Sequence, residues 1–262
     1  MRRFTGWRVT MLSLLFTGSA TVNGAIALTG TRLIFDGQYR EVSIEVRNLG
    51  KTETLFQAWL SDPHDSGGTS PDQRRSLPFV TTPPLSRLAV NGRQTLRILY
   101  QGAGMPQARE SLLHLYVLEV PRRQDGHRQL NIAVRQRINV FYRPSGLDGD
   151  PAEAAGQLLW QLVHGDSKRV VLKISNPTPY YTSLDAVRLD GIQLENDRLL
   201  APGDEFEWVL AGQISRFTQH RLSYNALTDY GARRGYCLRL IGQWVVKRHM
   251  LMNHLFLTTC VI

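Results

Sequence analysis

The amino-acid sequence predicts an all-β protein made of two β-sandwich domains. Short strand-like segments recur along the chain, and no long stretch shows the periodicity of a surface helix. A cluster of proline, glycine and aspartate also divides the chain near its middle. Regularly spaced short strands without helical periodicity are typical of sandwiches. The 262 residues, 42% hydrophobic and 20% charged, suffice for two packed cores.

The N-terminus is typical of a secretory signal peptide, which we expect over residues 1–24. Three arginines precede an apolar stretch at 9–16, which fades into a small and polar run at 17–24. This stretch is too short and interrupted for a transmembrane helix, so we expect no stable membrane insertion. Removing its three arginines, and no acidic residue, lowers the formal net charge from +9 to +6. An exported chain whose charge is spread out is not expected to bind nucleic acid.

Alternating polar and apolar residues predict the strands of the first domain. The segment at 41–47 alternates with a period of two and is followed by a turn. Turn-rich segments separate the later strands, and one of them holds Pro83 and Pro84, a rigid turn that can carry a cis bond. Trp59 is expected in the core. The further strands of this domain are expected at 55–60, 95–100, 112–120 and 129–141.

Residues 143–151 have the composition of an interdomain linker. They separate a domain expected at 25–144 from a second one expected at 145–262. Residues 152–160 have some helical character. Strands of the second domain are expected at 169–174, 186–189, 205–210 and 238–246.

The sequence offers no constellation typical of an enzyme or a metal site. The segment HDSGG at 64–68 superficially resembles the nucleophile motif of trypsin-like proteases, but a histidine stands where the motif needs glycine, and no partner histidine motif accompanies it. The seven histidines are scattered, so no metal or other cofactor is expected. Cys237 and Cys260 could form one disulfide in an oxidising compartment. The apolar tail from about residue 240 either packs as a final strand tied by that disulfide or is an appended sequence without a role.

Several segments, in order along the chain, together resemble the PapD-like family of periplasmic pilus chaperones. The mature start AIALTGTRLIFDG at 25–37 is similar to that family's first strand, and the tail from about residue 240 does not match the family. The other matching segments are QAW at 57–59, TPP at 82–84, RL at 87–88, Arg97, RES at 109–111, INVFYRP at 138–144, NPTPYY at 176–181 and DYG at 229–231.

This resemblance implies two immunoglobulin-like domains in an L or boomerang arrangement with a cleft between them. It implies a periplasmic protein that is not an enzyme and that binds, folds and caps pilus subunits (pilins). Such a chaperone lends one of its strands to fill the subunit's open groove, which is donor-strand complementation. It then delivers the subunit to an outer-membrane usher. The alternative is a secreted β-sandwich adhesin or structural surface protein.

The resemblance also implies a donor strand just before the linker. Leu130, Ile132 and Val134 alternate with more polar residues and fit that strand. The alternation alone is equally typical of an ordinary half-buried strand of the sandwich.

The family anchors the subunit's terminal carboxylate with an arginine of the first strand, matched by Arg32, and a lysine of the last. Guanidinium suits a carboxylate because it donates two parallel hydrogen bonds. Asn139 stands at the lysine position, and we hypothesise that Arg137 supplies the missing charge. Val134 and Arg137 have opposite parity, so either the anchor and the donor side chains lie on opposite faces, or a bulge resets the alternation.

The resemblance further implies an ion-pair network near the domain junction, which would fix the angle between the domains. Its members would be Arg97, Glu110, Arg143 and Asp229. As surface pairs they would contribute little to stability.

Overall fold

We describe the fold from a computed structural model. It describes residues 25–65, 73–121, 132–164, 170–210, 218–241 and 243–244. The expected signal peptide at 1–24 and Cys260 lie outside these ranges. Within them, no helix is long and apolar enough to span a membrane.

The first domain is a sandwich of two sheets. One sheet has the strand order β1-β3-β7-β5, and the other has the order β2-β9-β8-β4-β6. The strands are β1 (Ile26–Leu28), β2 (Arg32–Asp36), β3 (Glu41–Asn48), β4 (Thr54–Ser61), β5 (Phe79–Thr82), β6 (Leu85–Leu88), β7 (Arg93–Tyr100), β8 (Ser111–Pro121) and β9 (Arg135–Arg143).

The second domain is also a sandwich, with the strand orders β14-β11-β10-β17 and β13-β12-β15-β16. A short 3-10 helix, η2 (Ala154–Gln157), precedes it. Its strands are β10 (Leu159–His164), β11 (Val170–Ser175), β12 (Thr182–Leu189), β13 (Ile192–Leu200), β14 (Glu205–Leu210), β15 (Gln219–Leu227), β16 (Arg233–Ile241) and β17 (Gln243–Trp244).

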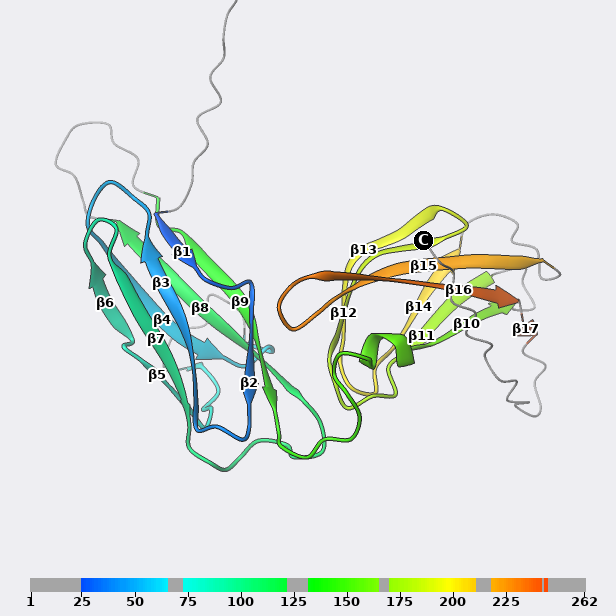
Figure 1. The fold of residues 1–262 in the computed structure, drawn as a ribbon, viewed down its shortest axis with the longest axis horizontal. Helices are drawn as coiled ribbons and strands as arrows, with labels where there is room; N and C mark the ends of the chain where they lie inside the picture. The colour runs from blue at the N-terminus through cyan, green and yellow to red at the C-terminus, as the bar shows by residue number, and fades with distance from the viewer. Residues whose placement is uncertain are drawn as a thin grey trace, which may run out of the picture.

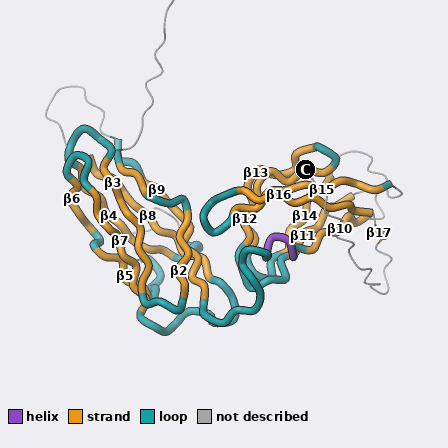
Figure 2. Tube along the Cα trace, viewed as in Figure 1, coloured by secondary structure: helices purple, strands orange, loops and turns teal. Residues whose placement is uncertain are grey.

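The two sandwiches meet at an angle and give the molecule the shape of a boomerang (Figure 1). Loops and the short helix form the elbow between the domains, while strands form the bodies of both (Figure 2). The hairpin loop between β15 and β16 points toward the first domain, on the side where β2 and β9 lie. The prediction of two immunoglobulin-like sandwiches is confirmed.

Alternation along the strands builds the first core. In β4, Phe56 and Ala58 are buried between the sheets, whereas Trp59 is half-buried on the opposite face. The prediction that Trp59 belongs to the core is therefore wrong, because its odd position turns it away from the other sheet. It stacks on Tyr116 of β8 instead, with ring centroids 5.3 Å apart. The largest buried side chains of this core are Phe35, Phe56, Leu96, Ile98, Leu113 and Leu115.

The second core forms around stacked aromatic rings. Trp160 lies 5.1 Å from Tyr224 and 6.0 Å from Trp208, measured between ring centroids. The hydroxyl of Tyr224 donates a hydrogen bond of 2.7 Å to the carbonyl of Ala155, which ties η2 to this core.

The helical character expected at 152–160 is limited to η2, and Leu159 and Trp160 already belong to β10. Of the C-terminal tail, β17 is described, and it runs parallel to β10 at the edge of its sheet. The Thr82–Pro83 bond is cis, in the turn expected there.

Candidate functional site

The last strand of the first domain, β9, has one edge that is only partly paired. Along one edge β9 pairs with β8 from Arg135 to Tyr142. Along the other edge it pairs in parallel with β2, and this pairing begins only at Asn139. Among the described residues, no strand occupies that second edge ahead of Asn139. An unpaired strand edge is a template for another strand.

The alternation along β9 is regular. The pairing with β8 shows no shift from Arg135 on, and the Val134 carbonyl accepts the Glu119 N–H at 2.8 Å in the same register. Ile138 and Val140 are buried in the core, so the even side chains face the core and the odd ones face away from it. The sequence left two alternatives open for Val134 and Arg137, opposite faces or a bulge between them. The structure shows the first: their side chains point to opposite faces of the sheet, and no bulge interrupts the strand.

Of the three residues expected in the donor strand, two are described. Ile132 is 50% exposed and Val134 is half-buried, both just ahead of β9. Leu130 lies outside the described residues. The two described side chains have the parity of the buried residues of β9.

The three expected anchor residues lie on one face of the sheet, away from the core. Arg32, at the start of β2, is the direct neighbour of Asn139 in the parallel pairing. Arg137 is two residues before Asn139 on the same strand, about 6.6 Å away along it. Arg137 is exposed, whereas Arg32 and Asn139 are half-buried.

This face of the first domain looks toward the second domain. The Nη1 of Arg32 donates to the Leu227 carbonyl at the end of β15, at 3.5 Å, and its guanidinium lies 5.8 Å from the ring centroid of Phe141. The Phe141 ring in turn contacts that of Tyr181, with centroids 5.4 Å apart. Burial lowers the pKa of Arg32, and the negative charge of Asp229 opposes that effect. Arg32 is therefore a partly desolvated cation at the junction.

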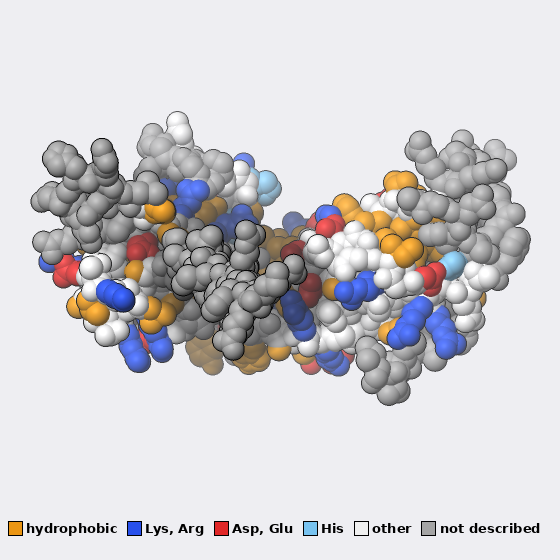
Figure 3. Space-filling model, turned by 90° about the horizontal axis from the view of Figure 1, so that it is seen from above, with side chains coloured by type: hydrophobic (Ala, Val, Ile, Leu, Met, Phe, Trp, Pro, Cys, Tyr) orange, Lys and Arg blue, Asp and Glu red, His pale blue; other side chains and the backbone are white. Residues whose placement is uncertain are grey.

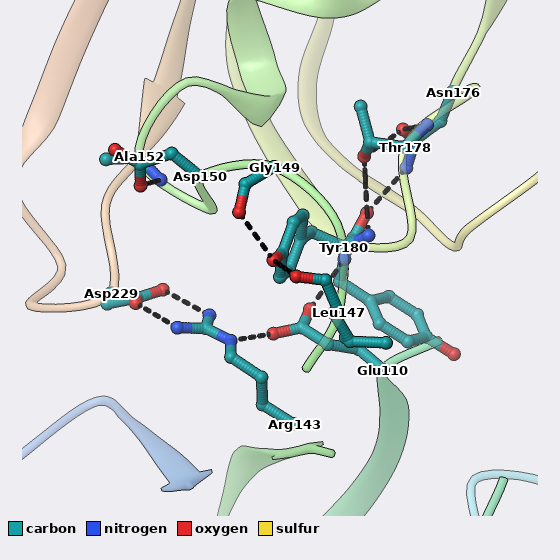
Figure 4. Close-up of polar contacts among 11 residues, drawn as sticks. Glu110, Arg143, Leu147, Gly149, Asp150, Ala152, Asn176, Thr178, Tyr180 and Asp229 are labelled. Carbon is teal, nitrogen blue, oxygen red and sulfur yellow. Dashed lines mark hydrogen bonds and ion pairs between the residues drawn. The ribbon is translucent and has the colours of Figure 1, made fainter. Parts of the chain in front are cut away.

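An ion-pair group joins the two domains beside this face (Figure 4). Arg143, at the end of β9, donates from Nε to Glu110 at 2.6 Å. Its two terminal nitrogens donate to the two carboxylate oxygens of Asp229, at 2.8 and 3.0 Å. Viewed from above, basic and acidic side chains lie side by side at the waist between the domains (Figure 3).

Glu110 is the most deeply buried member of this group. Its side chain is 2% exposed, so it is not the surface charge expected from the sequence. Its carboxylate accepts the N–H of Tyr181 at 2.7 Å, and its own N–H donates to the Pro179 carbonyl at 2.9 Å. Burial raises the pKa of Glu110, and Arg143 and the Tyr181 N–H oppose that effect.

Arg97 does not join this group. Its guanidinium pairs with Glu41 across the β3–β7 ladder, on the exposed surface of the other sheet. Its neighbours Leu96 and Ile98 are buried between the sheets, so Arg97 points to the opposite, outer face of its sheet, away from Arg143.

Two buried residues, His114 and Tyr116, lie on the same face of the sheet as Arg32, Arg137 and Asn139 and were not predicted from the sequence. They are directly opposite Asn139 and Arg137 in the β8–β9 ladder. Their parity, opposite to that of the buried leucines of β8, could have revealed them. Within the described ranges, no group of histidine, cysteine and acidic residues is suited to hold a metal ion.

Comparisons with known proteins match both domains. The family model described as the pili and flagellar-assembly chaperone PapD N-terminal domain matches residues 25–148. The model of the pili assembly chaperone PapD C-terminal domain matches residues 153–237. These matches favour the chaperone class over the alternative of an adhesin or structural surface protein.

Individual proteins are similar over most of their length. The chaperone protein FimB/FhaD of Bordetella pertussis is 32% identical, covering 88% of this chain and 94% of that protein. The crystal structure of the YadV chaperone is 30% identical, with a TM-score of 0.66, and covers 83% of this chain and all of that one. The SafB chaperone of Salmonella enterica, solved in complex with the SafA pilin, appears in a similar structure at 25% identity and a TM-score of 0.68, covering 85% of this chain and 98% of that one.

Proposed function

This chain belongs to the PapD family of pili assembly chaperones, and we propose that it binds pilus subunits in the periplasm, caps them by lending them a strand, and passes them to an outer-membrane usher. The relatives are named as chaperones, which is a role without catalysis. The similar structure of SafB with the SafA pilin supports a pilin as the partner.

The open edge of β9 supports strand lending. The Val134 carbonyl points to β8, so in a regular ladder the backbone groups of Arg135 and Arg137 point outward, to the edge that is open ahead of Asn139. A subunit strand placed there would gain ladder hydrogen bonds, while Leu130, Ile132 and Val134 would fill its groove.

The observation that carries the proposal is the pairing of Arg32 with Asn139 at the point where the open edge ends. A subunit strand along that edge would end beside Arg32, whose guanidinium can hold a terminal carboxylate by two hydrogen bonds. Arg137 adds a second positive charge on the same face, which Asn139 cannot supply.

We further propose that residues 1–24 direct export and are then removed. A similar structure is titled a periplasmic chaperone, SfaE, which supports the same compartment. The pairing of Arg143 with Glu110 and Asp229 would hold the two domains at a fixed angle around the bound subunit.

The test is a pull-down from the periplasm of the tagged mature protein with a co-expressed pilin subunit. We expect stoichiometric capture by the wild type and at least about tenfold less by Arg32→Ala, because a partly buried charge-assisted contact is lost. Arg137→Ala should lie between them. Arg93→Ala, which removes an exposed arginine from β7 of the other sheet, is the matched control and should bind as the wild type does.

The outcomes separate the parts of the proposal. If folded wild-type protein captures no subunit, the chaperone function proposed for this chain is wrong. If Arg137→Ala binds normally while Arg32→Ala does not, Arg137 does not replace the family lysine.

A further inference from the structure

His114 is a buried histidine whose polar ring the fold itself does not use fully. It lies in the first half of β8 and is 8% exposed. Its Nδ1 is fully buried and has no hydrogen-bond partner among the described residues. A buried polar atom without a partner costs about 1–3 kcal/mol, so the ring of His114 has hydrogen-bonding capacity that the described residues do not satisfy.

The register places His114 in one row with the anchor. It is directly opposite Asn139 across the β8–β9 ladder, and Asn139 is directly opposite Arg32 across the β9–β2 ladder. Residues directly opposite each other point to the same face, and neighbouring strands lie about 4.8 Å apart. His114 and Arg32 therefore flank Asn139 at about 10 Å between their Cα atoms, a gap that a bound carboxylate can bridge.

The groups that face His114 come from four elements. Arg137 on β9 and Asp62 beyond the end of β4 act on it electrostatically in opposite directions. On β8 itself, the ring of Tyr116 meets the imidazole edge-on, with centroids 6.2 Å apart. Arg32 on β2 is the next cation along the row. Asp62 is itself paired with His64.

We propose that His114 is a further ligand of the subunit's terminal carboxylate, donating from its ring to the same group that Arg32 holds. It would add, from the neighbouring strand, a further hydrogen bond and, when protonated, the positive charge that Asn139 lacks at the family's lysine position. This inference rests on the proposed function, because the ligand is the end of a subunit strand.

The proposal makes carboxylate binding depend on pH. Burial, followed by Arg137, lowers the pKa of His114 in the free protein. A bound carboxylate raises that pKa again, so the complex takes up a proton that the free protein lacks. Affinity therefore rises as the pH falls from about 7 to about 5, above the range in which the ligand carboxylate itself is protonated.

The experiment uses the mature protein and a fluorescently labelled peptide with alternating apolar side chains and a free C-terminal carboxylate. The same peptide with a C-terminal amide is the ligand control. We expect His114→Phe to weaken carboxylate binding about tenfold or more. His114→Gln, which retains a donor, should lose less and lose the rise at low pH. His220→Gln, at a buried histidine of the second domain, is the matched protein control and should keep that rise.

A second measurement covers the case in which His114→Phe does not fold. In the wild type labelled with nitrogen-15, the ring nitrogens of His114 should shift when the carboxylate peptide is added, and not when the amide is added. The wild type could prefer the carboxylate peptide while His114→Gln keeps the same pH profile and the ring-nitrogen signals of His114 do not shift. That result would refute the role of His114 and leave the carboxylate anchor at Arg32 intact. If the wild type does not distinguish carboxylate from amide, the anchor of the proposed function fails, and this inference with it.

Discussion

Replacing Arg143 by methionine should destabilise the protein far more than its partly exposed position suggests. The Arg143 side chain is 18% exposed, but the carboxylate that it pairs with, Glu110, is 2% exposed. Methionine has nearly the length of the arginine stem and no charge. The substitution therefore leaves Glu110 buried, with the Tyr181 N–H as the hydrogen-bond donor that remains to it.

The expected magnitude follows from this burial. Breaking a buried ion pair by removing one partner costs about 3–5 kcal/mol, and the retained hydrogen bond favours the lower end. The pKa of Glu110 is already raised by burial and would rise further without Arg143. A carboxyl group whose pKa is higher in the folded state contributes stability at low pH that is lost as the pH rises. The deficit of Arg143→Met should therefore be largest near pH 8 and shrink toward about pH 5.

Urea unfolding followed by circular dichroism measures this effect. A loss of about 3 kcal/mol moves the midpoint by about 1.5 M for a slope near 2 kcal/mol per M. Asp229→Asn is the matched comparison, because Asp229 is 36% exposed and its pair should contribute about 1 kcal/mol or less. Adding Glu110→Gln to Arg143→Met should recover much of the loss. If Arg143→Met and Asp229→Asn shift the midpoint equally, the argument from the burial of Glu110 is refuted.

Two further predictions concern the second domain. Asn176, 1% exposed, donates from its side chain to the Tyr180 carbonyl at 2.7 Å, so Asn176→Leu should cost about 2–3 kcal/mol in urea unfolding. An unchanged midpoint would show that this hydrogen bond is dispensable. Tyr224→Phe leaves the Ala155 carbonyl without its donor and should cost about 1 kcal/mol, seen as a lower melting temperature. Tyr230→Phe, at a side chain that is 98% exposed, should melt as the wild type does, and equal losses in the two variants would contradict the argument.

The sequence was sufficient to predict most of the fold. Strands in which polar and apolar residues alternate are those with one face packed against the other sheet. The strand expected at 41–47 is β3 at Glu41–Asn48, and the one expected at 205–210 is β14. Strand β15 was not predicted. Its buried positions include His220, Tyr224 and Ala226, which do not form a clear alternation of strongly apolar and polar residues. Near the linker, the alanines of η2 resembled a helix, although the chain turns into β10 after one turn.

For the candidate site, the sequence could indicate individual residues on one strand, but not which residues of neighbouring strands lie side by side. Arg32 and Asn139 were both chosen, but their adjacency depends on the parallel register of β2 and β9, which no local pattern encodes. Arg97 was assigned to the ion-pair group from the family resemblance, and the sequence does not reveal that its strand lies in the other sheet with Arg97 on the outer face. His114 was not chosen because its role depends on what lies across the ladder from it.

The topology itself constrains how a subunit strand could join this chaperone. Strand β2 occupies the edge of β9 from Asn139 onward, so an added strand can extend only along the residues before Asn139. If that strand ran antiparallel to β9, its N-terminal end would meet Arg32, and two positive charges would oppose each other. If it ran parallel to β9, its C-terminal end would stop there, with its carboxylate facing Arg32. A carboxylate anchor at Arg32 therefore requires a parallel donor pairing, and the same β2 residues that end the open edge also select the direction of the guest strand.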